Sequence, residues 1–244
     1  MAWFETWFDT EYYHLLYNNR NHAEADAFVE KLFEAEVLAA GMHILELACG
    51  KGRHAAAMYR LGATVLGVDL SANSIAAAEA LAEPGLGFAV HDMRQPMPGQ
   101  PHSYDAITNL FTSFGYFDDE ADNARVLANV VHALKPGGTF VLDFLNAAPT
   151  LRNLKPAHTE LRGHVRFDIT KRVEGGKILK TISVNDGLNT AGPFVEQVQA
   201  LTPADLTRLC QEAGLQVVSR YGDYHLRPLD VEGSARCILV CQAP

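Results

Sequence analysis

The feature that most constrains the fold is a regular alternation of short apolar runs with amphipathic stretches over residues 42–142. The apolar runs have the length and composition of strands, as in MHILEL, TVLGV, LGFAV, YDAITNL and TFVLDFL. The stretches between them are rich in Ala and Leu at helical spacing, as in RHAAAMYRL, NSIAAAEAL and ARVLANVVHAL. A repeated strand-helix order predicts an α/β fold, with a parallel sheet covered by helices.

Residues 146–201 interrupt this alternation. The segments HVRFDITKRV, KILKTISVN and FVEQVQAL resemble antiparallel strands joined by tight turns, one of them at Glu174-Gly175-Gly176. The core pattern resumes with a helix that Thr202 is placed to cap. We therefore expect an N-terminal helical lid segment at 1–41, a core at 42–145 and 202–244, and an antiparallel β cap at 146–201.

Composition excludes several kinds of partner. The formal net charge is −9 without a basic cluster, so the field of the protein repels a nucleic-acid backbone. No stretch is long and apolar enough to span a membrane, and the first residues lack the pattern of a signal peptide. The four cysteines have neither zinc-site nor disulfide-framework spacing, so we expect no metal. These observations indicate a cytoplasmic protein that acts on neither nucleic acid nor membrane. We expect a small-molecule substrate and either a monomer or a homodimer.

The strongest local signal is the segment from His43 to His54, an apolar strand followed by a glycine-bearing turn and a helix. Gly50 and Gly52 allow a ligand to approach the backbone, and the helix start presents unpaired N–H groups to it. The turn reads A-C-G-K-G-R-H, so it lacks the first and third glycines of the dinucleotide fingerprint G-x-G-x-x-G. The sequence of this turn therefore predicts a ligand site that differs from a dinucleotide site.

Acidic and polar residues follow the next strands. Asp69 comes 19 residues after Gly50 and ends the second strand, where a carboxylate can accept from two adjacent ribose hydroxyls. Asp92 and Met93 follow the third strand, placed for an adenine amino group and ring. Asn109 ends the fourth strand. Since carboxyl ends of parallel strands share one crevice, these residues predict a nucleoside site.

These four strand ends, in this order, resemble the class I S-adenosylmethionine-dependent methyltransferases of the small-molecule type, over residues 42–145 and 202–241. The resemblance implies S-adenosylmethionine as cofactor and a Rossmann-like seven-stranded, mostly parallel sheet with helices on both faces and the last strand antiparallel. Ala48 stands where the family usually has glycine, and Glu46 where aspartate is commoner. The implied cofactor-binding residues in the core are Glu46, Ala48, Cys49, Gly50, Gly52, Asp69, Leu70, Asp92, Met93, Asn109 and Leu110.

Two further segments have two interpretations each. Tyr13, Tyr17 and Arg20 could close over the cofactor carboxylate as a lid, with hydroxyl and guanidinium donors, or could pack as an ordinary aromatic segment. The aromatic residues of LFTSFGYF, directly after the fourth strand, could line the acceptor pocket or belong to the core. His225 and Arg227 are weaker candidates for the acceptor site.

The function implied by the resemblance is methyl transfer from S-adenosylmethionine to a nitrogen or oxygen nucleophile of a small molecule. One alternative is a nicotinamide-dependent oxidoreductase, and another is a non-enzymatic S-adenosylmethionine-binding regulator whose acceptor pocket is closed. The sulfonium is already activated, so no catalytic residue is obligatory, and the sequence selects none.

Overall fold

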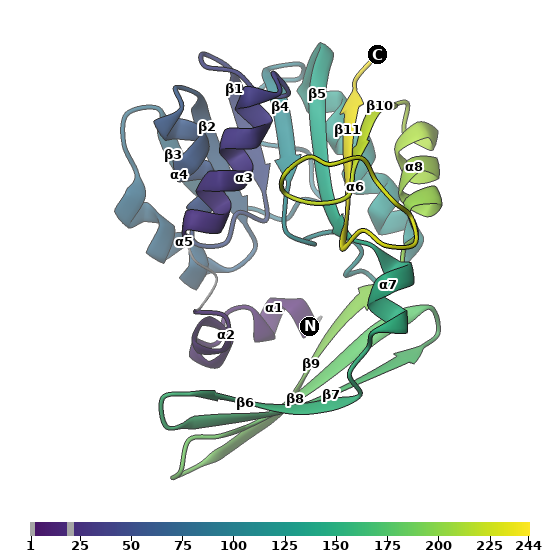
Figure 1. Ribbon diagram of the computed structural model, residues 1–244. Coiled ribbons are helices and arrows are strands. Elements are labelled where there is room, and N and C mark those ends of the chain that lie inside the picture. Colours follow the sequence, from purple (N-terminus) through teal and green to yellow (C-terminus); the bar gives the residue numbers. More distant parts are fainter. Residues whose placement is uncertain (1–2, 19–21) are drawn as a thin grey trace.

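The computed structural model describes residues 3–18 and 22–244, whose strands form two sheets (Figure 1). The larger sheet has seven strands in the order β10-β11-β5-β4-β1-β2-β3. Its strands are β1 (His43–Leu47), β2 (Thr64–Asp69), β3 (Leu86–Val90), β4 (Tyr104–Asn109), β5 (Leu134–Leu145), β10 (Gln216–Tyr221) and β11 (Arg236–Gln242). β11 runs antiparallel to both of its neighbours, β10 and β5, and the other strand pairs of this sheet are parallel. The predicted fold class is confirmed.

Helices cover both faces of this sheet because its strands are apolar on both sides. Along β1, Ile44 packs into one buried cluster, whereas Leu45 and Leu47 pack into the other. The Ile44 face is covered by α3 (His22–Glu34), α4 (Arg53–Arg60) and α5 (Ala72–Ala78), the last continued by the short 3₁₀ helix η1 (Glu79–Leu81). The opposite face is covered by α6 (Glu120–Ala133) and α8 (Pro203–Glu212). Thr202 caps α8 as predicted, in a reciprocal capping box with Asp205.

The inserted segment forms a second, antiparallel sheet in the order β6-β7-β8-β9. After α7 (Ala147–Arg152) come β6 (Ala157–Arg162), β7 (Val165–Glu174), β8 (Lys177–Asn185) and β9 (Thr190–Gln199). We refer to this sheet as the cap. Its strands β7 to β9 were expected from the sequence, but β6 was not, because its residues AHTELR supply no alternating apolar face.

The N-terminal segment divides into two parts. Helices α1 (Trp3–Trp7) and α2 (Glu11–Leu16) lie between the large sheet and the cap (Figure 1). Trp7 and Leu16 are buried among the apolar side chains of β7 and β8. In contrast, α3 packs against α4 and belongs to the core. Of the segment at 1–41 expected as a lid, α3 thus belongs to the core, and a lid role stays a prediction for α1 and α2. Within the described residues, the longest helices fall short of the apolar length that would cross a bilayer.

Candidate functional site

A cavity of about 1000 Å³ lies where the carboxyl ends of the parallel strands face the cap and the N-terminal helices. This volume is at the upper end of the range for small-molecule sites, roughly 300–1000 Å³. The residues predicted from the sequence that line it are Tyr13, Tyr17, Ala48, Cys49, Gly50, Asp69, Leu70, Asp92, Met93 and Leu110. Residues far apart in the chain are thus brought to one place.

The turn after β1 shows why two glycines are needed for different reasons. Ala48, Gly50 and Gly52 all have left-handed backbone, with φ of 52°, 56° and 79°. A Cβ added at Gly50 would meet no atom within 4 Å, so the space above it is open to a ligand. A Cβ added at Gly52 would lie 2.6 Å from the ring of Phe88 on β3. Gly52 therefore permits helix-strand packing, and it does not line the cavity.

Asp69 is fixed by the backbone of two turns. Its Oδ2 accepts a hydrogen bond from the Gly50 N–H and its Oδ1 accepts one from the Ser71 N–H, both at 2.8 Å. Burial raises the pKa of this carboxyl, and the two backbone N–H groups only partly offset that effect. Each carboxylate oxygen can accept more than one hydrogen bond. Asp69 is therefore held in one orientation and can still accept hydrogen bonds from two neighbouring hydroxyl groups of a ligand.

Asp92 follows β3, and the side chain of Arg94 is hydrogen-bonded to both of its carboxylate oxygens. Arg94 Nε lies 3.0 Å from both carboxylate oxygens, and Nη2 lies 2.6 Å from Oδ2. Although burial alone would raise the pKa of Asp92, the hydrogen bonds from Arg94 outweigh it and hold that pKa below its usual value. Asp92 thus stays ionised at the cavity wall, beside Met93.

Three predicted cofactor residues lie behind the cavity wall. They are Glu46, Gly52 and Asn109. Glu46 is 1% exposed. Its Oε1 is 3.2 Å from His54 Nδ1, and its Oε2 has no partner in the described part of the chain. Asn109 donates to the Leu47 carbonyl at 3.4 Å. A fourth, Arg20, lies outside the described residues.

The loop after β4 is strained and held by a buried ion pair. Phe111 and Thr112 both have positive φ, at 65° and 62°. The Phe111 N–H donates to Asp143 Oδ2 at 2.8 Å, and the Thr112 N–H donates to the Asp143 carbonyl at 3.0 Å. Arg236 Nη2 lies 2.7 Å from Asp143 Oδ1 and donates to Thr112 Oγ1 at 2.9 Å. Consecutive left-handed residues other than glycine are costly, so this network fixes the loop in one shape.

That loop places aromatic rings in different environments. Phe111 and Tyr116 line the cavity, and the Arg53 guanidinium lies 4.6 Å from the centre of the Phe111 ring. Phe114 is fully buried and belongs to the core. Phe117 is almost fully buried but also contacts the cavity. The other candidates, His225 and Arg227, are absent from the described cavity lining.

The N-terminal helices are attached to both walls of the cavity. On the core side, Asp9 Oδ1 accepts from Ser71 Oγ at 2.7 Å and from the Asn73 N–H at 3.0 Å. On the cap side, Glu196 Oε1 accepts from Trp7 Nε1 and from the Tyr17 hydroxyl, both at 2.7 Å. The segment therefore bridges the residues that follow β2, Ser71 and Asn73, and the cap.

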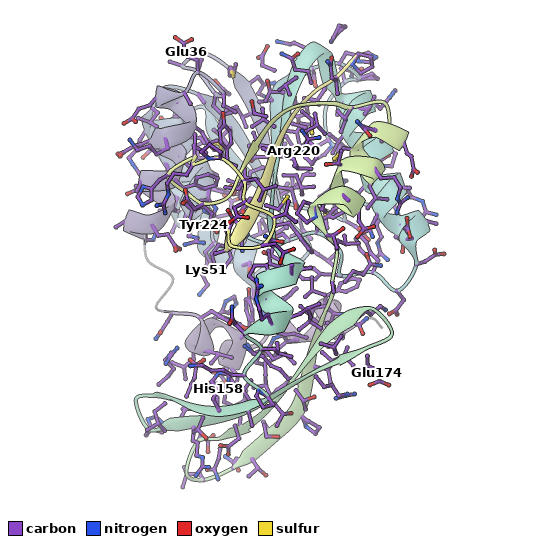
Figure 2. All side chains as sticks on the ribbon, turned by 45° about the vertical axis from the view of Figure 1, so that its right-hand side comes forward. Glu36, Lys51, His158, Glu174, Arg220 and Tyr224 are labelled. Carbon is purple, nitrogen blue, oxygen red and sulfur yellow. The ribbon has the colours of Figure 1, made fainter. Side chains whose placement is uncertain are left out.

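The cap contributes polar side chains that the sequence did not single out. His158 and Glu160 on β6, Lys171 on β7, Lys180 on β8 and Glu196 on β9 all line the cavity. Figure 2 shows His158 on the cap and Lys51 on the core, on opposite sides of this region. The strand register brings these charged residues of β7, β8 and β9 side by side. Lys171 pairs with Lys180, and Lys180 pairs with Glu196. Within the described residues, no cluster of His, Cys, Asp or Glu has the arrangement of a metal site.

Comparison with known proteins identifies similar sequences for the core. Residues 44–138 match the family model described as a methyltransferase domain. A ubiquinone biosynthesis O-methyltransferase from Albidiferax ferrireducens is 32% identical over 114 residues, or 45% of this chain and 44% of that protein. The chain spans about half the length of the curated relatives it first matches.

Solved structures extend the similarity to the whole chain. An S-adenosylmethionine-dependent methyltransferase from Clostridium acetobutylicum is 19% identical, with a TM-score of 0.78 covering 95% of this chain and 96% of that one. The S-adenosylmethionine-bound amino pentose methyltransferase CalS10 from Micromonospora echinaspora is 21% identical, with a TM-score of 0.70 covering 96% and 98%. At these identities the likeness concerns the fold. Together with the family match, it confirms the resemblance stated from the sequence.

Proposed function

We propose that this chain, which carries a methyltransferase domain of the class I S-adenosylmethionine-dependent family, transfers a methyl group from S-adenosylmethionine to a nitrogen or oxygen atom of a small molecule. The main support for this proposal is that Asp69 lies beside Gly50, above which the space is open, at one edge of a large cavity. An acceptor for a ribose diol and an unobstructed backbone turn lie side by side there.

The residues present fit the chemistry of S-adenosylmethionine. Asp69 suits the ribose, and the open turn at Gly50 leaves space for the amino-acid end of the cofactor. Leu70 and Met93 are apolar side chains at the wall that suit the faces of an adenine ring, next to the carboxylate of Asp92. When bound, this cofactor supplies a methyl group already activated by its positively charged sulfur.

The chain contributes alignment and exclusion of water to the proposed reaction. The rigid loop at Phe111 forms one wall of the cavity, so its position relative to the strand ends is fixed by Asp143 and Arg236. Helices α1 and α2 cover the cavity and are hydrogen-bonded to both sides of it through Asp9 and Glu196. Holding two reactants in line inside such a site removes much of the entropic barrier.

The acceptor site lies, in this proposal, between the loop at Phe111 and the inner face of the cap. The cavity continues from the strand ends to Thr150 and Leu154 near α7 and to the polar cap residues. This continuity favours an enzyme over a regulator with a closed acceptor pocket. The nicotinamide alternative has less support, because the turn after β1 lacks the dinucleotide glycines.

The experiment that tests the proposal has two stages. Calorimetric titration first measures binding of S-adenosylhomocysteine, the demethylated cofactor, to the purified protein. Formation of S-adenosylhomocysteine from S-adenosylmethionine is then measured over a panel of small amines, amino sugars and phenols. We expect binding in the micromolar range and turnover with members of one acceptor class. Absence of binding to either form of the cofactor would contradict the proposal.

A further inference from the structure

The inner face of the cap carries a row of three charged side chains. Lys171, Lys180 and Glu196 are opposite one another on β7, β8 and β9, and all three line the cavity. Residues paired across an antiparallel ladder share a face, so the row brings two ammonium groups and one carboxylate to the same side of the sheet. One carboxylate can balance the charge of only one of the two lysines.

The contacts of Glu196 show which lysine it balances. Its Oε2 lies 3.3 Å from Lys180 Nζ, and its Oε1 accepts a hydrogen bond from Trp7 Nε1 at 2.7 Å. The Tyr17 hydroxyl lies 2.7 and 2.8 Å from the two oxygens and also accepts a hydrogen bond from Lys180. Glu196 is thus fully used by Lys180 and by the N-terminal helices, and Lys171 needs another partner.

Lys171 is left without a partner of opposite charge in the described part of the chain. Among those residues, its Nζ forms no ion pair, hydrogen bond or contact with an aromatic face. Glu160 on β6 also lines the cavity, but it is paired with Arg162. Across the cavity, Asp143 is paired with Arg236. Lys171 is therefore an uncompensated positive charge on the inner face of the cap.

The ammonium group of Lys171 can be reached by a ligand. The residue is half-buried and lines the cavity, and its Nζ is not one of the described buried nitrogens that lack a partner. An unpartnered Nζ outside that group keeps accessible surface. Lysine can only donate, and two ammonium groups directly opposite each other repel, so an anion beside Lys171 is favoured.

The surroundings of Lys171 are apolar. The next row of the same face holds Ile178 and Val198, which pair with each other and line the cavity. Leu154, just after α7, lines it too, and the Lys171 N–H donates to the Pro156 carbonyl at 2.8 Å, so this segment lies against β7. A ligand bound there meets an apolar surface with one positive charge at its edge.

We propose that Lys171 determines acceptor specificity by pairing with an anionic group, a carboxylate or a phosphate, on an acceptor with an apolar body. This inference rests on the proposed function. Lys171 binds the acceptor and takes no part in the chemical step. The cofactor's own carboxylate belongs at the opposite wall, where Lys51 directly follows Gly50 and lines the cavity (Figure 2). The anion at Lys171 is therefore part of the acceptor.

The first test measures binding without turnover. Protein saturated with S-adenosylhomocysteine is titrated calorimetrically with acids and their esters, which differ in charge at one end. The pairs are aminobenzoate and hydroxyphenylacetate with their methyl esters, and aminobenzylphosphonate with its diethyl ester. We expect the acid of at least one pair to bind about tenfold to hundredfold more tightly than its ester, as a charge-assisted hydrogen bond allows.

The pair that shows this preference distinguishes a carboxylate from a phosphate-like group. If no acid bound more tightly than its ester, the inference would be overturned. S-adenosylhomocysteine failing to bind to the parent protein would instead overturn the proposed function.

Variants of Lys171 assign the preference to this side chain. Lys171→Met removes the charge and keeps an unbranched side chain, so the preference for the acid should disappear, whereas Lys171→Arg should retain most of it. For an acid that is methylated, Lys171→Met should raise KM about tenfold to hundredfold with kcat within about threefold. Lys155→Met, at an exposed lysine that does not line the described cavity, is the matched control and should behave as the parent.

Two results with Lys171→Met would refute the role of this lysine. One is an unchanged preference for the acid. The other is a large loss of affinity for S-adenosylhomocysteine, which would mean that Lys171 binds the cofactor's carboxylate; we expect that affinity to stay within about twofold of the parent.

Discussion

Replacing Asp69 with alanine should weaken cofactor binding strongly while the protein still folds. The carboxylate is the expected acceptor for two ribose hydroxyls, and losing charge-assisted hydrogen bonds costs on the order of 1.5–3 kcal/mol. That loss corresponds to a dissociation constant for S-adenosylhomocysteine roughly tenfold to hundredfold higher. Isothermal titration calorimetry on parent and variant measures this ratio directly.

The same substitution has a stability cost that the structure makes explicit. Asp69 also accepts the N–H groups of Gly50 and Ser71, and leaving both without that acceptor costs roughly 1–3 kcal/mol. For a chain of this length that is a fall in Tm of roughly 2–12 °C. Asp168→Ala, at a carboxylate on the outer side of the cap, is the control and should leave affinity unchanged. Equal affinity for Asp69→Ala and the parent, with both folded, would refute the ribose assignment.

Three further predictions follow from the same geometry. Because burial raises the pKa of Asp69, affinity for S-adenosylhomocysteine should fall with decreasing pH earlier than for an ordinary aspartate. Asp69→Asn should show no such dependence in titrations across that range. Gly52→Ala should lower the Tm strongly because its Cβ would clash with Phe88. Gly50→Ala should chiefly weaken cofactor binding, because the space above Gly50 is open. If both variants changed the Tm and the affinity for S-adenosylhomocysteine equally, this division would be contradicted. Asp9→Ala should release the N-terminal helices from the core, because it removes their hydrogen bonds to Ser71 and Asn73. We expect faster hydrogen exchange over residues 3–18 and about tenfold faster dissociation of S-adenosylhomocysteine. Unchanged hydrogen exchange would mean that the segment is ordinary packing.

The core of the fold could be predicted because its signals are local. The strands β1 to β5 are apolar runs, and the helices between them have apolar residues at helical spacing. The polar strand ends then fall at one edge by topology alone, so the sequence predicts that Asp69 and Asp92 line the same cavity, as they do. Gly52 lay in the same local motif, but its reason for being glycine is contact with Phe88, 36 positions away in the chain.

The rest of the site depends on contacts between distant segments, which no local pattern encodes. Asp143 and Arg236 form the buried ion pair that shapes the loop at Phe111, yet 93 positions separate them. Asp9 accepts a hydrogen bond from Ser71, which lies 62 positions further along the chain. Strand β6, with His158, has polar residues on both faces and sits at the edge of the cap, so its sequence lacks the alternation that marks a strand.

In the proposed function, one cavity binds the cofactor at the strand ends and an acceptor beneath the cap. A crystal structure of the protein with S-adenosylhomocysteine tests this most directly. We expect the ribose hydroxyls on Asp69, the amino-acid end above Gly50, and the sulfur facing open space that extends toward His158. Ribose bound away from Asp69, or a sulfur atom sealed off from the cap by protein side chains, would contradict this arrangement.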